Sequence, residues 1–164
     1  MSGARAAKVP RNRDDGGRAS ASATGRGKPM CAVTMRHAQF TLSRSFVFEA
    51  AHTLNRRDID PPSMDASRRI HGHSYRATVE VTGSLSGASG MVLDLACLDA
   101  ELACVRERLD HRLLDDVAGL GPATLENLCA FIWRALAPHL AGLSRVSVSR
   151  DARGDACSLT MRDA

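Results

Sequence analysis

The sequence contains few aromatic residues and no long apolar run. Phe, Trp and Tyr together make up 4% of its 164 residues, whereas apolar residues as a whole make up 44%. A core must therefore be built from Leu, Val, Ala and Ile, and the length is typical of one domain. No apolar run approaches the ~18 residues that span a bilayer. We expect a soluble protein with no membrane partner.

Paired cysteines are also absent. The five cysteines contain no CxxC motif, their number is odd, and they are widely spaced: Cys31, Cys97, Cys104, Cys129 and Cys157. This pattern does not suit a disulfide framework. It predicts reduced thiols in a cytoplasmic protein.

The basic charge is confined to the beginning of the chain. Residues 1–38 hold eight of the 22 Lys and Arg residues but two of the 18 Asp and Glu residues, so the net charge of +4 becomes −2 in the remainder. Residues 1–37 show no apolar period, and we predict a disordered basic tail there, followed by one domain at 38–164. A nucleic-acid-binding arm is an alternative to a solvated extension or to a translation start at Met30 or Met35. We do not expect a nucleic-acid partner.

Apolar periodicity predicts four strands and two helices. Alternation at 40–52 indicates a strand with a bulge near Ser43–Arg44, and 73–85 a second strand, with a loop at 53–67 between them. Helical spacing follows from Leu95 to Leu109, and again after Thr124, a good N-cap. Residues 145–150 and 157–162 read as short strands. This order favours an α+β fold, an antiparallel four-stranded sheet with two helices packed on one face.

Two histidines lie on either side of a glycine in RRIHGHSY, residues 69–76. Residues at i and i+2 of a strand share a face, so His71 and His73 can converge with His52, which ends the preceding predicted strand. Three imidazoles with a free fourth position are typical of a catalytic zinc site. The alternative is a chance pair of surface histidines.

A carboxylate and an imidazole are adjacent in RLDHRLL, directly after the first predicted helix. Asp110 can fix the tautomer of His111 and raise its basicity, which suits proton transfer. The alternative is a solvated pair at a helix end, where a histidine complements the helix dipole.

Six motifs occur in the order found in the 6-pyruvoyltetrahydropterin synthase family, which includes bacterial 6-carboxytetrahydropterin synthase, and the chain resembles that family over roughly residues 40–155. The motifs are FVFEAAH at 46–52, RRIHGHSY at 69–76, GMVLDLACL at 90–98, LDHRLL at 109–114, ATLENL at 123–128 and VSVSR at 146–150. The resemblance implies the tunnelling fold. It also implies a homohexamer of two trimers, with active sites between subunits.

The resemblance further implies a reaction. The substrate would be 7,8-dihydroneopterin triphosphate, and Zn²⁺ held by the three histidines would polarise its side chain. A base removes a proton and triphosphate leaves. In the bacterial branch acetaldehyde is then lost, giving 6-carboxytetrahydropterin on the way to 7-deazaguanine and queuosine. Asp110 and His111 would form one proton relay.

Two positions depart from the family pattern. The family's catalytic cysteine, four residues before HGH, is replaced by Ser67, whose hydroxyl ionises far less readily than a thiol; nearby Asp65 is a candidate to activate it. The family's pterin-anchoring glutamate is replaced by Arg150, which donates hydrogen bonds only and suits an anion. Thr124 and Glu126, in the matching motif ATLENL, are implied to bind substrate.

Three readings of the domain therefore stay open. The first is a zinc-dependent lyase of the 6-carboxytetrahydropterin synthase type. The second is a divergent paralogue of the same fold that acts on another anionic substrate, and the third is a non-catalytic zinc-binding oligomer.

Overall fold

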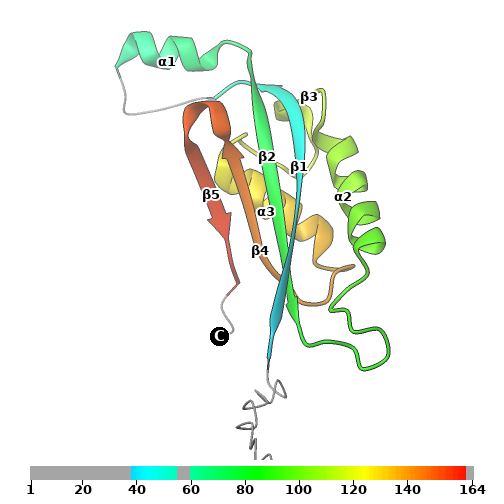
Figure 1. The fold of residues 1–164 in the computed structure, drawn as a ribbon. Coiled ribbons are helices and arrows are strands. Elements are labelled where there is room, and N and C mark those ends of the chain that lie inside the picture. The colour runs from blue at the N-terminus through cyan, green and yellow to red at the C-terminus, as the bar shows by residue number, and fades with distance from the viewer. Residues whose placement is uncertain (1–37, 55–59, 162–164) are drawn as a thin grey trace, which may run out of the picture. The chain divides into compact units, whose positions relative to one another are not determined.

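The computed structural model describes residues 38–54 and 60–161, so the predicted tail at 1–37 lies outside the described residues. The described elements, with two short 3₁₀ helices named η1 and η2, are β1 (Phe40–His52), α1 (Pro61–Arg68), β2 (His71–Gly83), α2 (Leu95–Leu109), β3 (Arg112–Leu113), η1 (Leu114–Asp116), α3 (Leu125–Leu136), β4 (Leu143–Arg150), η2 (Asp151–Arg153) and β5 (Asp155–Leu159). Figure 1 shows their arrangement.

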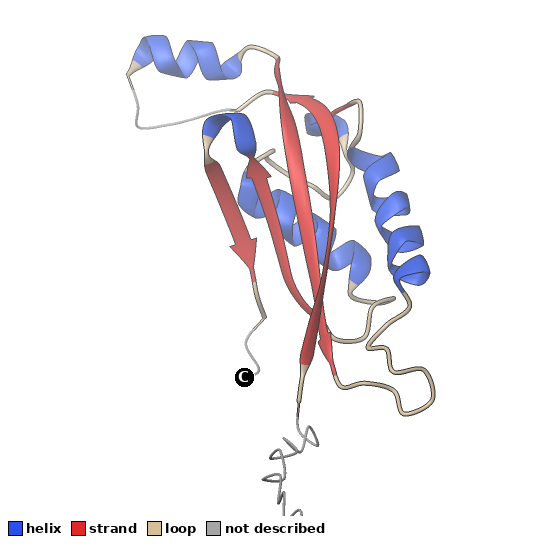
Figure 2. Cartoon of the chain, in the orientation of Figure 1, coloured by secondary structure: helices blue, strands red, loops and turns tan. Residues whose placement is uncertain are grey.

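In the described part of the chain the strands form one five-stranded sheet, in the order β3-β1-β2-β4-β5 (Figure 2). The four long strands pair antiparallel, as predicted. The predicted four-stranded, wholly antiparallel sheet is nevertheless wrong, because β3 adds a short parallel pair to β1. The chain leaves α2 alongside β1, where the His111 N–H donates to the Glu49 carbonyl at 2.6 Å. Two residues of edge pairing leave no alternation that a sequence reading could detect.

β1 and β2 pair over all 13 residues of each strand. The bulge predicted near Ser43–Arg44 is therefore wrong. The alternation breaks because Arg44 lies on the helix-facing side of the strand between Leu42 and Phe46, where its guanidinium binds Asp99 of α2 through Nε and Nη2, at 2.6 and 2.7 Å. In the described sheet the register shift falls between β2 and β4, after Glu80.

The segment predicted as a loop at 53–67 contains a third described helix, α1. The Asp60 carboxylate accepts a hydrogen bond from the Ser63 N–H at 3.0 Å, and Pro61 takes the first helical position, where its missing N–H costs nothing. The helix buries none of its described side chains. A sequence rich in Asp, Pro and Ser favours a loop, but here the same residues start a helix.

Helices α2 and α3 cover one face of the sheet, as predicted (Figure 1). The buried stripe of α2 is Leu98, Leu102, Val105 and Leu109, while Leu95 is exposed. Thr124 caps α3, accepting a hydrogen bond from the Asn127 N–H at 3.3 Å. The core between the helices and the sheet also holds Phe48 and Tyr75, whose rings stack at 5.0 Å. None of the helices in the described ranges is long and apolar enough to cross a membrane.

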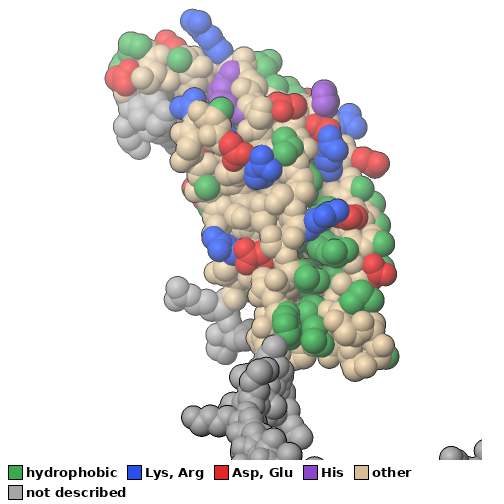
Figure 3. Space-filling view, in the orientation of Figure 1, with side chains coloured by type: hydrophobic (Ala, Val, Ile, Leu, Met, Phe, Trp, Pro, Cys, Tyr) green, Lys and Arg blue, Asp and Glu red, His purple; other side chains and the backbone are tan. Residues whose placement is uncertain are grey.

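The opposite face of the sheet is polar. Hydroxyl pairs link neighbouring strands there, Thr41 with Thr82 at 2.9 Å and Ser45 with Thr78 at 2.7 Å. Figure 3 shows acidic and basic side chains interspersed over the visible face, and histidines at the end of the molecule near α1.

The four cysteines of the described segments are free. Cys97 and Cys104 are exposed on α2, whereas Cys129 on α3 is buried and donates to the Cys157 carbonyl at 3.5 Å. Burial raises the pKa of the Cys129 thiol to about 12. Because the thiolate is the reactive form, this thiol is protected at ordinary pH.

We therefore expect iodoacetamide to label the exposed Cys97 and Cys104 in the native protein, and to leave Cys129 unlabelled up to about pH 10. A raised pKa keeps the thiol protonated, and so unreactive, throughout this range. Peptide mass spectrometry after labelling measures each site, with the urea-unfolded protein as the control in which all sites react. Labelling of native Cys129 at the rate of Cys97 would contradict the assignment.

Candidate functional site

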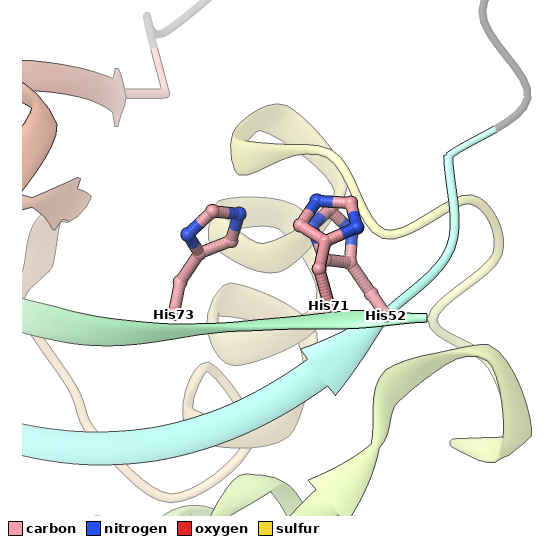
Figure 4. A group of neighbouring side chains, drawn as sticks. All are labelled: His52, His71 and His73. Atoms are coloured by element: carbon pink, nitrogen blue, oxygen red, sulfur yellow. The ribbon is translucent and has the colours of Figure 1, made fainter. Parts of the chain in front are cut away.

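Three histidines converge at one end of the sheet. His52 ends β1 and His71 begins β2, and the antiparallel register pairs them directly; His73 follows two residues later on the same face. The ring centroids lie 4.5 Å apart for His52 and His71, 5.2 Å for His52 and His73, and 5.0 Å for His71 and His73. One nitrogen from each ring lies within 4.8 Å of the others (Figure 4). This arrangement can hold a metal ion.

The protonation of the rings also suits a metal. His71 donates from Nδ1 to the Arg69 carbonyl at 2.8 Å, which leaves its Nε2 as an acceptor. His52 is 1% exposed, and neither of its nitrogens has a hydrogen-bond partner among the described residues. Burial lowers the pKa of His52, and burial followed by the Arg150 guanidinium lowers the pKa of His73 to about 4. Both rings are therefore neutral at neutral pH, the form that binds a metal.

An orphaned buried nitrogen is costly, at about 1–3 kcal/mol for a group left unsatisfied. His52 carries two ring nitrogens, and one of them must present an unpaired lone pair to the site. A cation bound by the three rings would satisfy that lone pair. The donor set, three imidazoles with a cavity beside them, fits a catalytic zinc site.

The triad opens into a cavity of about 650 Å³. The walls come from α1, β2, the start of α3, and the hairpin between β4 and β5. All three residues predicted to bind substrate, Thr124, Glu126 and Arg150, line it. The Thr124 hydroxyl is engaged as the helix cap, whereas Glu126 is exposed.

Arg150 is held by a carboxylate that sequence reasoning missed. Its Nε donates to Asp155 at 3.0 Å, and its Nη2 donates to the second oxygen of the same side chain. Its remaining terminal nitrogen, Nη1, lies 3.3 Å from His73 Nε2. Asp155 lies directly across the β4–β5 pair from Arg150. The register of that hairpin is the signal that identifies it.

Ser67 also lines the cavity, but its hydroxyl is engaged elsewhere. Oγ donates to the Met64 carbonyl at 2.9 Å, a bond within its own helix. Asp65, the candidate to activate it, is exposed and its carboxylate lies 3.9 Å from Arg68. Ser67 has no base in hydrogen-bonding contact in the described structure.

The Asp110–His111 pair forms as predicted, but outside this cavity. Asp110 accepts from the Glu49 N–H at 2.9 Å and from Arg106 at 3.0 Å, and lies 3.0 Å from His111 Nδ1. The Glu49 hydrogen bond lowers the pKa of Asp110. The His111 side chain is 79% exposed and borders another hollow, whose lining includes Ser74 and His73. Within one chain the structure does not bring this pair to Ser67.

Two more residues that sequence reasoning missed fix the walls of the site. Asp115 accepts from the N–H and the hydroxyl of Thr53, at 2.8 and 2.6 Å, and so holds the chain just after His52. The Tyr75 ring lies edge-on to His73 at 5.8 Å, and its buried hydroxyl has no hydrogen-bond partner in the described part of the chain.

Comparison with known proteins places these features in a family context. The family model described as 6-pyruvoyl tetrahydropterin synthase matches residues 41–161. A 6-carboxy-5,6,7,8-tetrahydropterin synthase from Synechocystis sp. is 38% identical over 98 residues, 57% of this chain and 71% of the relative. The 6-pyruvoyl tetrahydrobiopterin synthase of Homo sapiens is 32% identical over 108 residues, 60% of this chain and 74% of the relative.

The fold is also found among solved structures. The 6-pyruvoyl tetrahydropterin synthase of Caenorhabditis elegans superposes with a TM-score of 0.65 and 25% identity, covering 76% of this chain and 97% of that one. The Plasmodium vivax 6-pyruvoyl tetrahydropterin synthase, at 15% identity and a TM-score of 0.60, shares the fold.

We expect His71→Ala to abolish stoichiometric zinc binding, because two remaining imidazoles provide too few ligands for a tetrahedral site. Metal content after dialysis against trace zinc, measured by mass spectrometry, tests this. His139→Ala is the control, since His139 is exposed beyond the end of α3. Full zinc occupancy in the His71 variant would show that the ligands have been misassigned.

Proposed function

Because the chain belongs to the 6-pyruvoyl tetrahydropterin synthase family, we propose that it is a zinc-dependent lyase of the 6-carboxytetrahydropterin synthase type. Its substrates would be 7,8-dihydroneopterin triphosphate and one water molecule, and its products 6-carboxytetrahydropterin, acetaldehyde and triphosphate. The observation that carries the proposal is the convergence of three imidazoles on one wall of the cavity. The similarity to the Synechocystis enzyme supports the choice of this branch.

The histidine triad would hold the zinc. Bound zinc acts as a Lewis acid toward the side-chain oxygens of the substrate. The Arg69 carbonyl orients the His71 ring, and burial keeps His52 in its neutral, ligating form.

The part of the cavity wall formed by Glu126, Arg150 and Asp155 would bind the pterin ring. The ring edge presents amino and ring N–H donors beside a carbonyl acceptor. Glu126 and Asp155 offer carboxylate oxygens to the donors, and each Asp155 oxygen keeps a lone pair beyond those used by Arg150. Arg150 supplies N–H donors for the carbonyl. The pair of Arg150 and Asp155 thus takes the place of the single glutamate implied by the family resemblance.

Asp110 and His111 would move a proton. A hydrogen bond from His111 Nδ1–H to Asp110 leaves Nε2 free to accept a proton from the substrate. Because neither Asp110 nor His111 lines the cavity of the triad, we propose that the pair acts at the cavity of a second copy of the chain. The proposed protein is therefore a homo-oligomer, a hexamer as the resemblance implies, and the edge strands of its described sheet, β3 and β5, are available for contacts between copies.

A second candidate is a paralogue of the same fold that acts on another anionic substrate. Arg150 and Arg153 both line the cavity, and two guanidinium groups favour a carboxylate or phosphate ligand. Ser67, bonded to its own helix, gives no support for a strong base at that position.

The experiment that tests the main proposal is incubation of the zinc-loaded chain with 7,8-dihydroneopterin triphosphate. We expect acetaldehyde and triphosphate to be released in equal amounts together with 6-carboxytetrahydropterin, as measured by coupled assay and mass spectrometry. The His71→Ala variant is the control that should release neither. Triphosphate release without acetaldehyde would assign the chain to the pyruvoyl branch, and no turnover with full zinc would favour the second candidate.

We expect Ser67→Cys to raise turnover by about tenfold or more, because a thiol ionises near pH 8.5 and supplies a base that a serine hydroxyl does not. Ser63→Cys is a matched control, since Ser63 lines the same cavity one helical turn earlier. Steady-state rates at equal zinc content compare the variants. Equal rates for wild type and Ser67→Cys would argue against a base at this position.

A further inference from the structure

One contact in the site is at odds with simple metal binding. The Arg150 Nη1 atom lies 3.3 Å from His73 Nε2. Arginine has donors only, so this nitrogen of His73 must be the one that carries the lone pair. Figure 4 shows the ring nitrogen of His73 that is farther from its main chain turned toward His52 and His71. The guanidinium therefore contacts the atom of His73 that faces the metal position.

The guanidinium is firmly placed there. Asp155 binds it through two nitrogens, and the β4–β5 pairing sets Arg150 and Asp155 opposite one another. The Arg150 side chain is 20% exposed, so solvent screens its charge only in part. The two bonds to Asp155 leave Nη1 of Arg150 with no partner among the described residues other than His73.

A lone pair on an imidazole nitrogen can accept one N–H or bind one metal ion, but not both. The positive charge of Arg150 also repels a dication bound by the same ring. Asp155 offsets part of that charge, which makes a bound metal tolerable rather than excluded.

We infer that Arg150 competes with the metal for His73 and so sets the metal affinity of the triad. This inference rests on the proposed metal site and adds a residue that weakens it. A metal ion binds only when Nη1 gives up the His73 lone pair, so metal occupancy depends on the position of one arginine side chain.

The test measures zinc affinity directly, by competition with a chromogenic zinc chelator on the full chain. We expect Arg150→Gln to tighten zinc binding by about 10- to 100-fold, the range over which groups next to metal ligands act. Arg150→Met, which has neither charge nor N–H, should do the same and covers the case in which the glutamine variant fails to fold. Circular dichroism confirms folding of each variant.

The matched control is Arg145→Gln. Arg145 also lies on β4 and also reaches β5, donating to the Ser158 hydroxyl at 2.9 Å, but it contacts no residue of the triad. Its removal should leave zinc affinity unchanged. The double variant with His71→Ala and Arg150→Gln should not show the increased zinc affinity. That result would show that the increase arises at the triad.

The outcomes separate this inference from the proposed function. Equal or weaker zinc binding by both Arg150 variants overturns the inference and leaves the metal site standing. A failure of every variant, and of the wild type, to bind zinc overturns both. Tighter binding without turnover of the pterin triphosphate supports the inference while it removes the proposed reaction.

Discussion

The antiparallel register between β1 and β2 is the constraint on which the site depends. It sets His52 opposite His71, and the two-residue period of β2 adds His73 to the same face. A shift of one residue would turn His71 and His73 to the polar face of the sheet and leave His52 alone in the core. The register is held by 13 residues of pairing and by apolar side chains, such as Phe48 and Tyr75, that must face the helices.

The site combines groups with opposing demands. Three imidazoles form a ligand set for a cation, while the neighbouring guanidinium supplies a positive charge of its own. The carboxylate of Asp155 offsets part of the positive charge of Arg150, because it stays paired with that side chain within the cavity. Asp110 and His111 form a well-connected pair that does not line the cavity of the triad.

Sequence patterns predicted the long strands, the two covering helices and the triad, because each of these has a clear period or spacing. They failed where tertiary contacts decide the structure. The alternation suggested a bulge because Arg44 is a charged residue at an inward-facing position of the strand, where it forms an ion pair with Asp99. Asp155 was missed because its contact with Arg150 depends on the length of the turn between β4 and β5. Helix α1 was missed because, in the sequence, an aspartate followed by proline is as typical of a loop as of a helix start; here Asp60 caps the helix.

Helix α1 contributes a wall of the cavity yet buries none of its described side chains. Substitutions on it therefore remove little packing, and the folding free energy of the domain is nearly indifferent to them. A residue that faces the cavity from this helix, such as Ser67, can be replaced without loss of the folded protein. Residues on α1 can therefore change the chemistry of the cavity at little cost to the stability of the fold.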